Sequence, residues 1–233
     1  MEGTVLVATM NTGENRHNPD FARNMAEVLT RVEEDRSITA MVLASEGPKF
    51  WSLGIDLDWM MARFGEKDLP GIASFMHSMN EVFKKMLLLP VPLVAAINGH
   101  AFGNGAILSC ACDFRFMRSD KGYFCFPEVD LGIPFLPGMM AFVKKAMPYH
   151  LFNEMKLSGR RAGAQELFEH HFLSKASADP EALLADAVAY AQTFVKKRGI
   201  FGEHKRRMHQ HIIDIIDTQD PGYIDSGNLF VAD

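Results

Sequence analysis

The sequence predicts an α/β protein, and three features of its pattern indicate that class. Short apolar runs alternate with longer amphipathic segments over roughly the first two thirds of the chain. One run, residues 92–98 (PLVAAIN), is almost wholly apolar, as in a parallel strand that is buried on both faces. From about Pro137 onward the pattern is helical, with one short extended piece. We therefore expect a core over residues 1–136 and a helical region over residues 137–233, together forming a single functional unit.

Each expected element begins or ends at a recognisable signal. Asn18 and Pro19 supply an N-cap and a first helical residue, and Pro90 and Pro92 end a long amphipathic helix. The strands are the short apolar runs, at residues 4–10, 39–45, 92–98 and 113–119. The helices are the segments with apolar residues at helical spacing, at residues 18–34, 71–89, 103–112, 138–147, 151–157, 163–171, 180–198 and 203–217.

Composition and charge argue against several classes of function. The formal net charge is -5 and no basic run exceeds three residues, as at residues 205–207, so nucleic acid is not expected as a ligand. No apolar run is long enough to span a membrane, and neither a basic leader nor a peroxisomal Ser-Lys-Leu address is visible, so we expect a cytoplasmic protein. Cys110, Cys112 and Cys125 are too few for a disulfide framework, and we expect them to be small buried apolar residues.

Neither a metal site nor a nucleophile motif stands out. His170 and His171 are adjacent, and His204, His209 and His211 fall in one helix, but none has zinc-site spacing with cysteines or a His-Glu-x-x-His frame. The tail histidines are expected on a solvated helix face. There is also no Gly-x-Ser-x-Gly elbow and no P-loop. We therefore expect no bound metal and no separate cofactor.

A glycine-rich stretch, INGHAFGNGAIL at residues 97–108, joins a buried strand to a helix. Glycines allow a tight turn, and a helix start leaves backbone N–H groups free, which together can form an oxyanion site. Close packing of a strand–helix corner accounts for the glycines equally well. Dinucleotide binding through Gly103 and Gly105 is a third interpretation, although Leu108 occupies the place of that pattern's third glycine or alanine. His100 is a candidate ligand contact or a structural hydrogen-bonding residue.

A second segment, KFWSLGIDL at residues 49–57, has the same character. A glycine precedes a short helix that is expected to start near Asp56, so backbone N–H groups are again presented at a helix start. One such loop is commonly structural. Two such loops, each following a strand of one core, favour an oxyanion hole with two donors.

One acidic side chain lies in an apolar segment, FPEVDLGIP at residues 126–134. Apolar surroundings raise the pKa of a carboxyl group, so Glu128 is a candidate general base and acid near neutral pH. The commoner fate of a lone glutamate is to cap a turn or to pair with an arginine. Asp130 is a candidate second acid or ligand contact, or a turn residue before Gly132.

Together these segments resemble the crotonase superfamily, the enoyl-CoA hydratase/isomerase family. KFWSLGIDL is similar to the family's Phe-Ser/Cys-Ala-Gly-x-Asp-Leu loop, and FPEVDLGIPF to its Pro-Glu-x-x-Leu-Gly segment. PLVAAINGHAFGNGAILSCACDFRF is similar to its Pro-x-x-Ala-x-x-Asn-Gly-x-Ala-x-Gly-Gly-Gly segment followed by Cys-Asp. The order and spacing agree over about residues 39–140. The resemblance implies a crotonase-like spiral of ββα units with a C-terminal helical region that mediates trimers or dimers of trimers.

The resemblance also implies an acyl-CoA thioester substrate, with coenzyme A as part of that substrate. The oxyanion donors would be the backbone N–H groups of Ile55 and Asn104. The residues implied to contact coenzyme A or the substrate surround those donors: Ser52, Leu53, Gly54, Asp56, Phe102, Gly103, Gly105 and Ile107. Further candidates for the acyl pocket are Phe124, Met139 and Met140.

One departure from the family pattern bears on the reaction. Hydratases of the family usually carry two glutamates, and the corresponding positions here are Ile107 and Glu128. Hydration needs one group to activate water and another for the second proton, whereas a single base can move a double bond. The chain therefore resembles the Δ3,Δ2-enoyl-CoA isomerases of fatty acid β-oxidation more closely. The alternatives are a hydratase, a thioester hydrolase, a C–C lyase or a dehalogenase using Asp130 or His100, and a non-catalytic homologue that binds coenzyme A or RNA.

Overall fold

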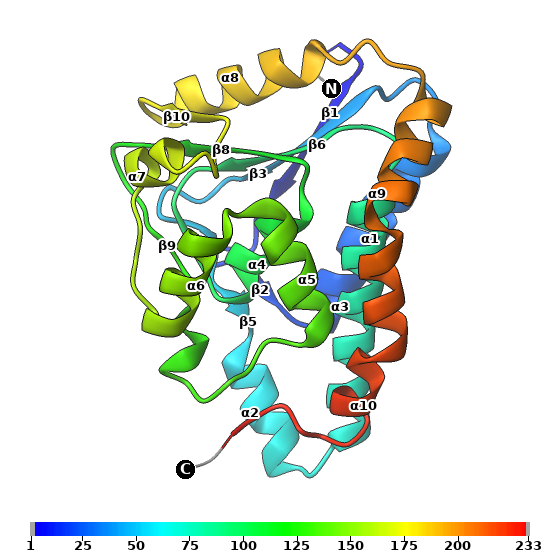
Figure 1. The fold of residues 1–233 in the computed structure, drawn as a ribbon, viewed down its shortest axis with the longest axis vertical. Helices are drawn as coiled ribbons and strands as arrows, with labels where there is room; N and C mark the ends of the chain where they lie inside the picture. The colour runs from blue at the N-terminus through cyan, green and yellow to red at the C-terminus, as the bar shows by residue number, and fades with distance from the viewer. Residues whose placement is uncertain (1–2, 232–233) are drawn as a thin grey trace.

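The computed structural model of the protein describes residues 3–231. Five parallel strands form the central sheet, in the spatial order β1-β3-β6-β8-β10 (Figure 1). They are β1 (Val5–Met10), β3 (Ala40–Ser45), β6 (Leu93–Ile97), β8 (Phe114–Arg118) and β10 (Lys175–Ser177). Parallel neighbours need crossover connections, which the helices supply. The arrangement confirms the α/β class predicted from the sequence.

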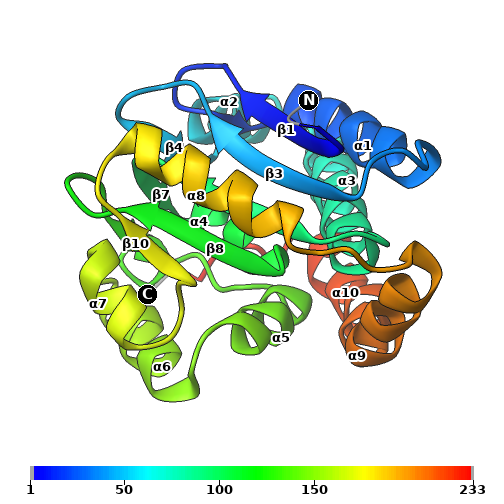
Figure 2. The same cartoon turned by 90° about the horizontal axis from the view of Figure 1, so that it is seen from above.

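The central sheet separates two apolar layers. Met41 and Leu43 of β3 face the main core, whereas Val42 between them faces a smaller core, which explains the continuous apolar runs. Helices α1 and α3 pack together on the main-core side, and α8 lies across the opposite face of the sheet (Figure 2). The three helices are α1 (Pro19–Glu34), α3 (Leu69–Leu88) and α8 (Pro180–Gln192). Asn18 caps α1 as predicted, since its side chain accepts a hydrogen bond from the Phe21 N–H at 3.1 Å.

Two small parallel sheets lie beside the large one. One pairs β2 (Arg16–His17) with β5 (Gly54–Ile55), and the other has the order β4-β7-β9. The strands of the second are β4 (Phe50–Ser52), β7 (His100–Phe102) and β9 (Phe124–Cys125). Each follows a strand of the large sheet and precedes a helical segment: α2 (Leu57–Gly65), α4 (Asn104–Ala111) or the 3-10 turn η1 (Pro127–Val129). These are repeated ββα units, and the sequence motifs lie at the point where each unit turns into its helix.

The remaining helices surround this core. They are α5 (Pro137–Ala146), α6 (Tyr149–Ser158), α7 (Ala164–Glu169), α9 (Arg198–Thr218) and α10 (Asp220–Ile224). Helix α9 packs along α3 and α5 (Figure 1). The region expected to be helical also contributes β10, the edge strand that pairs with β8. The division at residues 136/137 stays a prediction, and the central sheet extends across it.

The prediction of a helix over residues 180–198 is wrong at the C-terminal end. Helix α8 stops at Gln192, and α9 begins five residues earlier than expected, at Arg198. The Arg198 guanidinium donates hydrogen bonds to the carbonyl oxygens of Val32 at 2.7 Å and Ile38 at 2.6 Å. These bonds tie the start of α9 to the carboxyl end of α1, where free carbonyl groups favour a cation. The start of α9 is therefore in contact with a segment 160 residues away in sequence.

Burial tests the expectations for cysteine and histidine. The three cysteines are free and buried, as predicted. The expectation that the tail histidines share a solvated face is wrong for His209, which is only 4% exposed, although His204 and His211 are exposed. Burial lowers the pKa of His209 to about 4. Across residues 3–231, the helices are all too short or too polar to cross a bilayer.

Candidate active site

A cavity of about 110 Å³ lies where the helical segments of the ββα units meet the C-terminal part of the chain. Its lining residues are apolar apart from Asn104 and Glu128. The lining residues are Leu53, Ile55, Leu57, Met60, Met76, Gly103, Asn104, Ile107, Pro127, Glu128, Leu131, Ile133, Pro134, Phe135, Leu136, Met139, Leu229 and Phe230. Apolar walls with a few convergent polar groups are typical of small-molecule sites.

The two predicted loops approach each other backbone to backbone. Gly54 has φ +80°, and a Cβ there would lie 2.6 Å from the backbone nitrogen of Asn104 and 2.9 Å from the carbonyl oxygen of Phe102. Only glycine can adopt this conformation and also leave room for the neighbouring chain. The glycine of the first loop is thus required by the close approach of the second.

Both expected oxyanion donors line this cavity, and their N–H groups are available. Asn104 is the first residue of α4, where the first helical bond is the one from the Ile107 N–H to the Gly103 carbonyl, so the Asn104 N–H has no acceptor within the helix. Asp56 donates its N–H to the His17 carbonyl at 2.9 Å. Because amides alternate in direction along a parallel strand, the Ile55 N–H points away from β2.

Glu128 stands beside these donors. Gly103 has φ +56°, and a Cβ there would lie 3.3 Å from Glu128 Oε1, so the carboxyl group sits against the start of α4. Its side chain is buried in an apolar wall, and within residues 3–231 its Oε2 has no hydrogen-bond partner. Burial raises the pKa of Glu128 to about 7, and its own backbone N–H and the nearby Lys156 ammonium oppose that rise. The carboxyl group is therefore poised to exchange protons near neutral pH.

Lys156 is the cation whose charge acts on the pKa of Glu128. It lies on α6, only 8% exposed, with its Nζ 3.9 Å from the ring centroid of Phe135. Burial lowers the pKa of Lys156, and the carboxylate of Glu128 opposes that shift. Lys156 does not line the cavity, whereas Phe135 and Glu128 do.

The structure divides the sequence-predicted residues by place. The cavity wall holds Ile55, Asn104, Glu128, Leu53, Gly103, Ile107 and Met139. Directly behind it, Ser52, Gly54 and Gly105 are buried, and Asp56 caps α2 by accepting from the Trp59 N–H at 3.2 Å. Outside the wall are Phe102, Phe124, Met140, His100 and Asp130.

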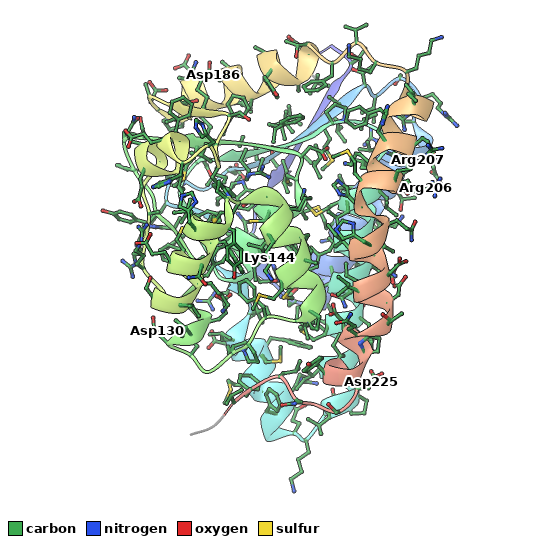
Figure 3. The ribbon with its side chains drawn as sticks, in the orientation of Figure 1. Asp130, Lys144, Asp186, Arg206, Arg207 and Asp225 are labelled. Atoms are coloured by element: carbon green, nitrogen blue, oxygen red, sulfur yellow. The ribbon has the colours of Figure 1, made fainter. Side chains whose placement is uncertain are left out.

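Two of the outlying residues have other partners, and a third is exposed. His100 accepts a hydrogen bond from the Tyr123 N–H at 3.2 Å, and Phe102 packs under the Arg161 guanidinium at 5.2 Å. Asp130 is exposed and lies on the outer side of the molecule (Figure 3). The positions considered for a second acid, His100 and Asp130, are therefore outside the cavity.

Sequence reasoning missed several residues of the site. Met60 and Met76 reach the cavity from α2 and α3, and Leu229 and Phe230 reach it from the C-terminal segment. Their apolar character gives no signal that distinguishes them from core residues. His17, buried beneath the two loops, also went unremarked because nothing in its polar neighbourhood predicts burial. In the part of the chain that the structure describes, no group of three His, Cys, Asp or Glu side chains could hold a metal ion.

Comparison with known proteins identifies the family. Residues 1–219 match the family model described as enoyl-CoA hydratase/isomerase. The enoyl-CoA delta isomerase 2, peroxisomal, of Arabidopsis thaliana is 32% identical over 181 residues, covering 76% of this chain and 74% of its own. The carnitinyl-CoA dehydratase of Escherichia coli O157:H7 is 28% identical over 232 residues, covering 97% and 85%.

Solved structures confirm the fold. An enoyl-CoA hydratase/isomerase family protein from Pseudomonas syringae superimposes with a TM-score of 0.86 at 21% identity, covering 97% of this chain and 95% of that one. An enoyl-CoA hydratase from Bacillus halodurans gives a TM-score of 0.86 at 17% identity, covering 97% and 90%. The expected crotonase-like arrangement of ββα units is thus confirmed. Because the family model spans residues 1–219 and the delta isomerase is 32% identical, the chain belongs to the enoyl-CoA hydratase/isomerase family, the crotonase superfamily.

Proposed function

We propose that this protein isomerises 3-enoyl-CoA to trans-2-enoyl-CoA, with Glu128 as the single acid/base. One observation carries the proposal: of the described residues that line the cavity, only Glu128 has an ionisable side chain. Moving a double bond needs one group that removes a proton at one carbon and returns it at another. An apolar cavity with one carboxyl group suits that requirement.

In the proposed reaction Glu128 takes a proton from C2 of the substrate. The C2–H bonding electrons form a dienolate, whose negative charge collects on the thioester oxygen. The N–H groups of Ile55 and Asn104 stabilise that oxygen, each by roughly 3–4 kcal/mol when compared with known oxyanion donors. Glu128 then returns the proton at C4, which leaves the double bond between C2 and C3 and restores the carboxylate.

The basicity of Glu128 supports its role. A carboxylate with pKa about 7 is a stronger base than an ordinary glutamate, and about half of it is ionised at pH 7. Among the described residues, Glu128 Oε2 has no hydrogen-bond partner, so this oxygen can accept the substrate's proton. General acid–base catalysis of this kind contributes about 10²–10⁴-fold.

Hydration or dehydration of an enoyl-CoA is the second candidate function. It is favoured by the similarity to carnitinyl-CoA dehydratase, which is close to that with the delta isomerase. Against it, Ile107 lines the cavity where hydratases of the family usually carry a second glutamate. A water molecule activated in this cavity would have no second ionisable side chain among the described lining residues.

The test is to supply 3-hexenoyl-CoA and trans-2-hexenoyl-CoA separately and to follow both double-bond migration and 3-hydroxyacyl-CoA formation. We expect rapid conversion of the first substrate to trans-2-enoyl-CoA and little hydration of the second. Efficient hydration of trans-2-hexenoyl-CoA would overturn the isomerase assignment in favour of a hydratase. Turnover of neither substrate would favour another acyl-CoA reaction or a binding function.

Other parts of the proposal rest on the sequence and family alone. Coenzyme A is proposed to enter and leave as part of the substrate, so no separate cofactor is invoked. Cytoplasmic location, a trimer or dimer of trimers, and a place in fatty acid β-oxidation stay predictions.

A further inference from the structure

A fully buried histidine lies beneath the two loops that carry the proposed oxyanion donors. His17 belongs to β2, whose partner strand β5 contains Ile55, and its ring stacks on Phe21 with centroids 4.0 Å apart. The ring contacts both loops: Nδ1 is 2.8 Å from Asn104 Nδ2, and Nε2 is 3.0 Å from Ser52 Oγ.

The hydrogen bonds around His17 fit one neutral tautomer when Ser52 donates to Asn15. Ser52 Oγ has one hydrogen, and it donates this to the Asn15 carbonyl at 2.8 Å. The hydroxyl must then accept from His17 Nε2–H, which leaves Nδ1 as the acceptor for the Asn104 side-chain amide. Ser52 Oγ also accepts from the Gly54 N–H at 3.1 Å. One neutral tautomer therefore links the Asn104 side chain to the backbone just before Ile55.

The surroundings favour that neutral form. His17 is in contact with the Phe21 ring, and burial lowers its pKa to about 3. A protonated ring would point an N–H at the Asn104 amide, which is itself a donor, and would break the link. The ring therefore stays neutral at ordinary pH and keeps its hydrogen bonds to Ser52 and Asn104.

We propose that His17 is a positioning residue that sets the spacing of the two oxyanion donors by bridging Ser52 and the Asn104 side chain. The inference rests on the proposed function, since it assigns a role to the support of that oxyanion hole. Ile55 and Asn104 come from different loops that pack backbone to backbone at Gly54, and the His17 bridge adds a side-chain connection that can hold the spacing of their N–H groups. Small displacements of such groups are costly, with losses near 10²-fold for about 1 Å.

Asn104 contributes both a proposed backbone donor to the cavity and a side-chain hydrogen bond to His17. Its backbone faces the cavity as a proposed donor, and its side chain faces His17. The family segment that this chain resembles has glycine at that position, which has no side chain to bond. The asparagine therefore gives this chain a direct attachment between the start of α4 and β2.

The experiment is a double-mutant cycle with His17→Leu and Asn104→Ala, and His204→Leu on the exposed face of α9 as a matched control. Asn104→Ala keeps the backbone N–H. We expect each single variant to lower kcat for 3-hexenoyl-CoA about 10–100-fold with KM within about threefold of wild type, because the oxyanion contacts strengthen in the transition state. The double variant should be no slower than the slower single variant. His204→Leu should match wild type.

Two results would overturn the inference: wild-type kcat in either single variant, or losses that multiply in the double variant. If His17→Leu fails to fold, Asn104→Ala still decides, since it leaves β2 intact. A merely structural role would lower the melting temperature of His17→Leu without the split between kcat and KM.

A second measurement separates this inference from the proposed function. In ¹⁵N-labelled protein, bound butanoyl-CoA should shift the amide resonances of Ile55 and Asn104 together in wild type. In His17→Leu, at saturation, the Asn104 shift should be lost or reduced. Wild type that shows both shifts but does not isomerise would refute the proposed reaction and leave the positioning role in place. Equal shifts in wild type and His17→Leu would refute the positioning role alone.

Discussion

The two ends of the cavity are built from different parts of the chain and by different means. At the reactive end, two backbone amides and the carboxyl group of Glu128 come from the turns of the ββα units, where main chain packs on main chain. At the far end, side chains form the wall: they come from α2, α3, α5 and the C-terminal segment, as Leu57, Met60, Met76, Met139, Leu229 and Phe230. In the proposed reaction, the chemistry therefore depends on two backbone amides and Glu128, and acyl selection depends on apolar side chains.

This difference teaches how each end should respond to substitution. A backbone N–H survives most side-chain changes, so the reactive end should fail only when a glycine, the bridge beneath it or Glu128 is altered. A side-chain wall adjusts with each substitution, so the far end should change which substrate is preferred. Reaction rate and chain-length preference should therefore be separable.

Removing the base should have the largest effect. Glu128→Gln keeps the shape of the side chain but cannot take the C2 proton, so kcat for 3-hexenoyl-CoA should fall by about 10²–10⁴-fold. Affinity for butanoyl-CoA, measured by calorimetry, should stay close to wild type. Glu46→Gln at an exposed position is the control and should keep full activity. An active Glu128→Gln enzyme would show that the base is another residue.

Separating the two loops should come next. Gly54→Ala adds a Cβ that would lie 2.6 Å from the Asn104 nitrogen, at φ +80°. We expect kcat to fall by about 10²-fold, as for loss of one oxyanion donor, and stability to fall by about 1–3 kcal/mol from backbone strain. Gly65→Ala in α2, where an added Cβ has open space, is the matched control and should be neutral in both assays. Equal behaviour of the two variants would refute the tight loop contact.

The pH dependence tests the environment of Glu128. Because the base must be ionised, kcat/KM should rise about tenfold per pH unit below pH 7 and level off above the pKa of about 7. Lys156→Met removes the cation that favours the carboxylate, so its profile should move to higher pH. A profile with its midpoint near the ordinary glutamate pKa would contradict the burial of an ionisable base in this wall.

The same pKa predicts a stability effect of opposite sign to the activity effect. Because folding raises the pKa of Glu128 from 4.5 to about 7, its contribution favours the folded state below pH 4.5 and is lost as pH rises through 7. Glu128→Gln should therefore stabilise the protein at pH 8 by on the order of 3 kcal/mol, and hardly at pH 4. Thermal unfolding at the two pH values checks this. Equal changes in melting temperature would contradict it.

Opening the far end should have the smallest effect on rate. Phe230 lines the cavity and packs edge-on against Phe64, with ring centroids 5.3 Å apart. Phe230→Ala should leave kcat/KM for a short 3-enoyl-CoA within about threefold and raise it for longer chains by about 10-fold, the scale of a few methylene contacts. Val231→Ala, beside it but 64% exposed, is the control. An equal loss for all chain lengths would place Phe230 outside the acyl wall.

Much of the site could be read from local signals. Residues 49–57 and 97–108 each combine a strand end, a glycine and a helix start, and Glu128 stands in an apolar run; the structure places all three at one cavity. Such signals are readable because strand and helix formation depend on spacing within a few residues. The start of α9 at Arg198 could not be predicted from local spacing, because its guanidinium bonds to Val32 of α1 and to Ile38, about 160 residues away in sequence.

By itself, the sequence determined the α/β class, the three turns that carry the polar groups of the proposed site, and the apolar neighbours that raise the pKa of Glu128. Only the tertiary structure decided which groups meet. It brings Gly54 against Asn104 and places His17 between the two loops. It also brings Leu229 and Phe230 to the same cavity as Glu128, although they lie about 100 residues away from it in sequence. The physical reason is range. Local periodicity and turn chemistry act over a few residues, whereas these juxtapositions arise from burying apolar surface and pairing polar groups across the whole chain.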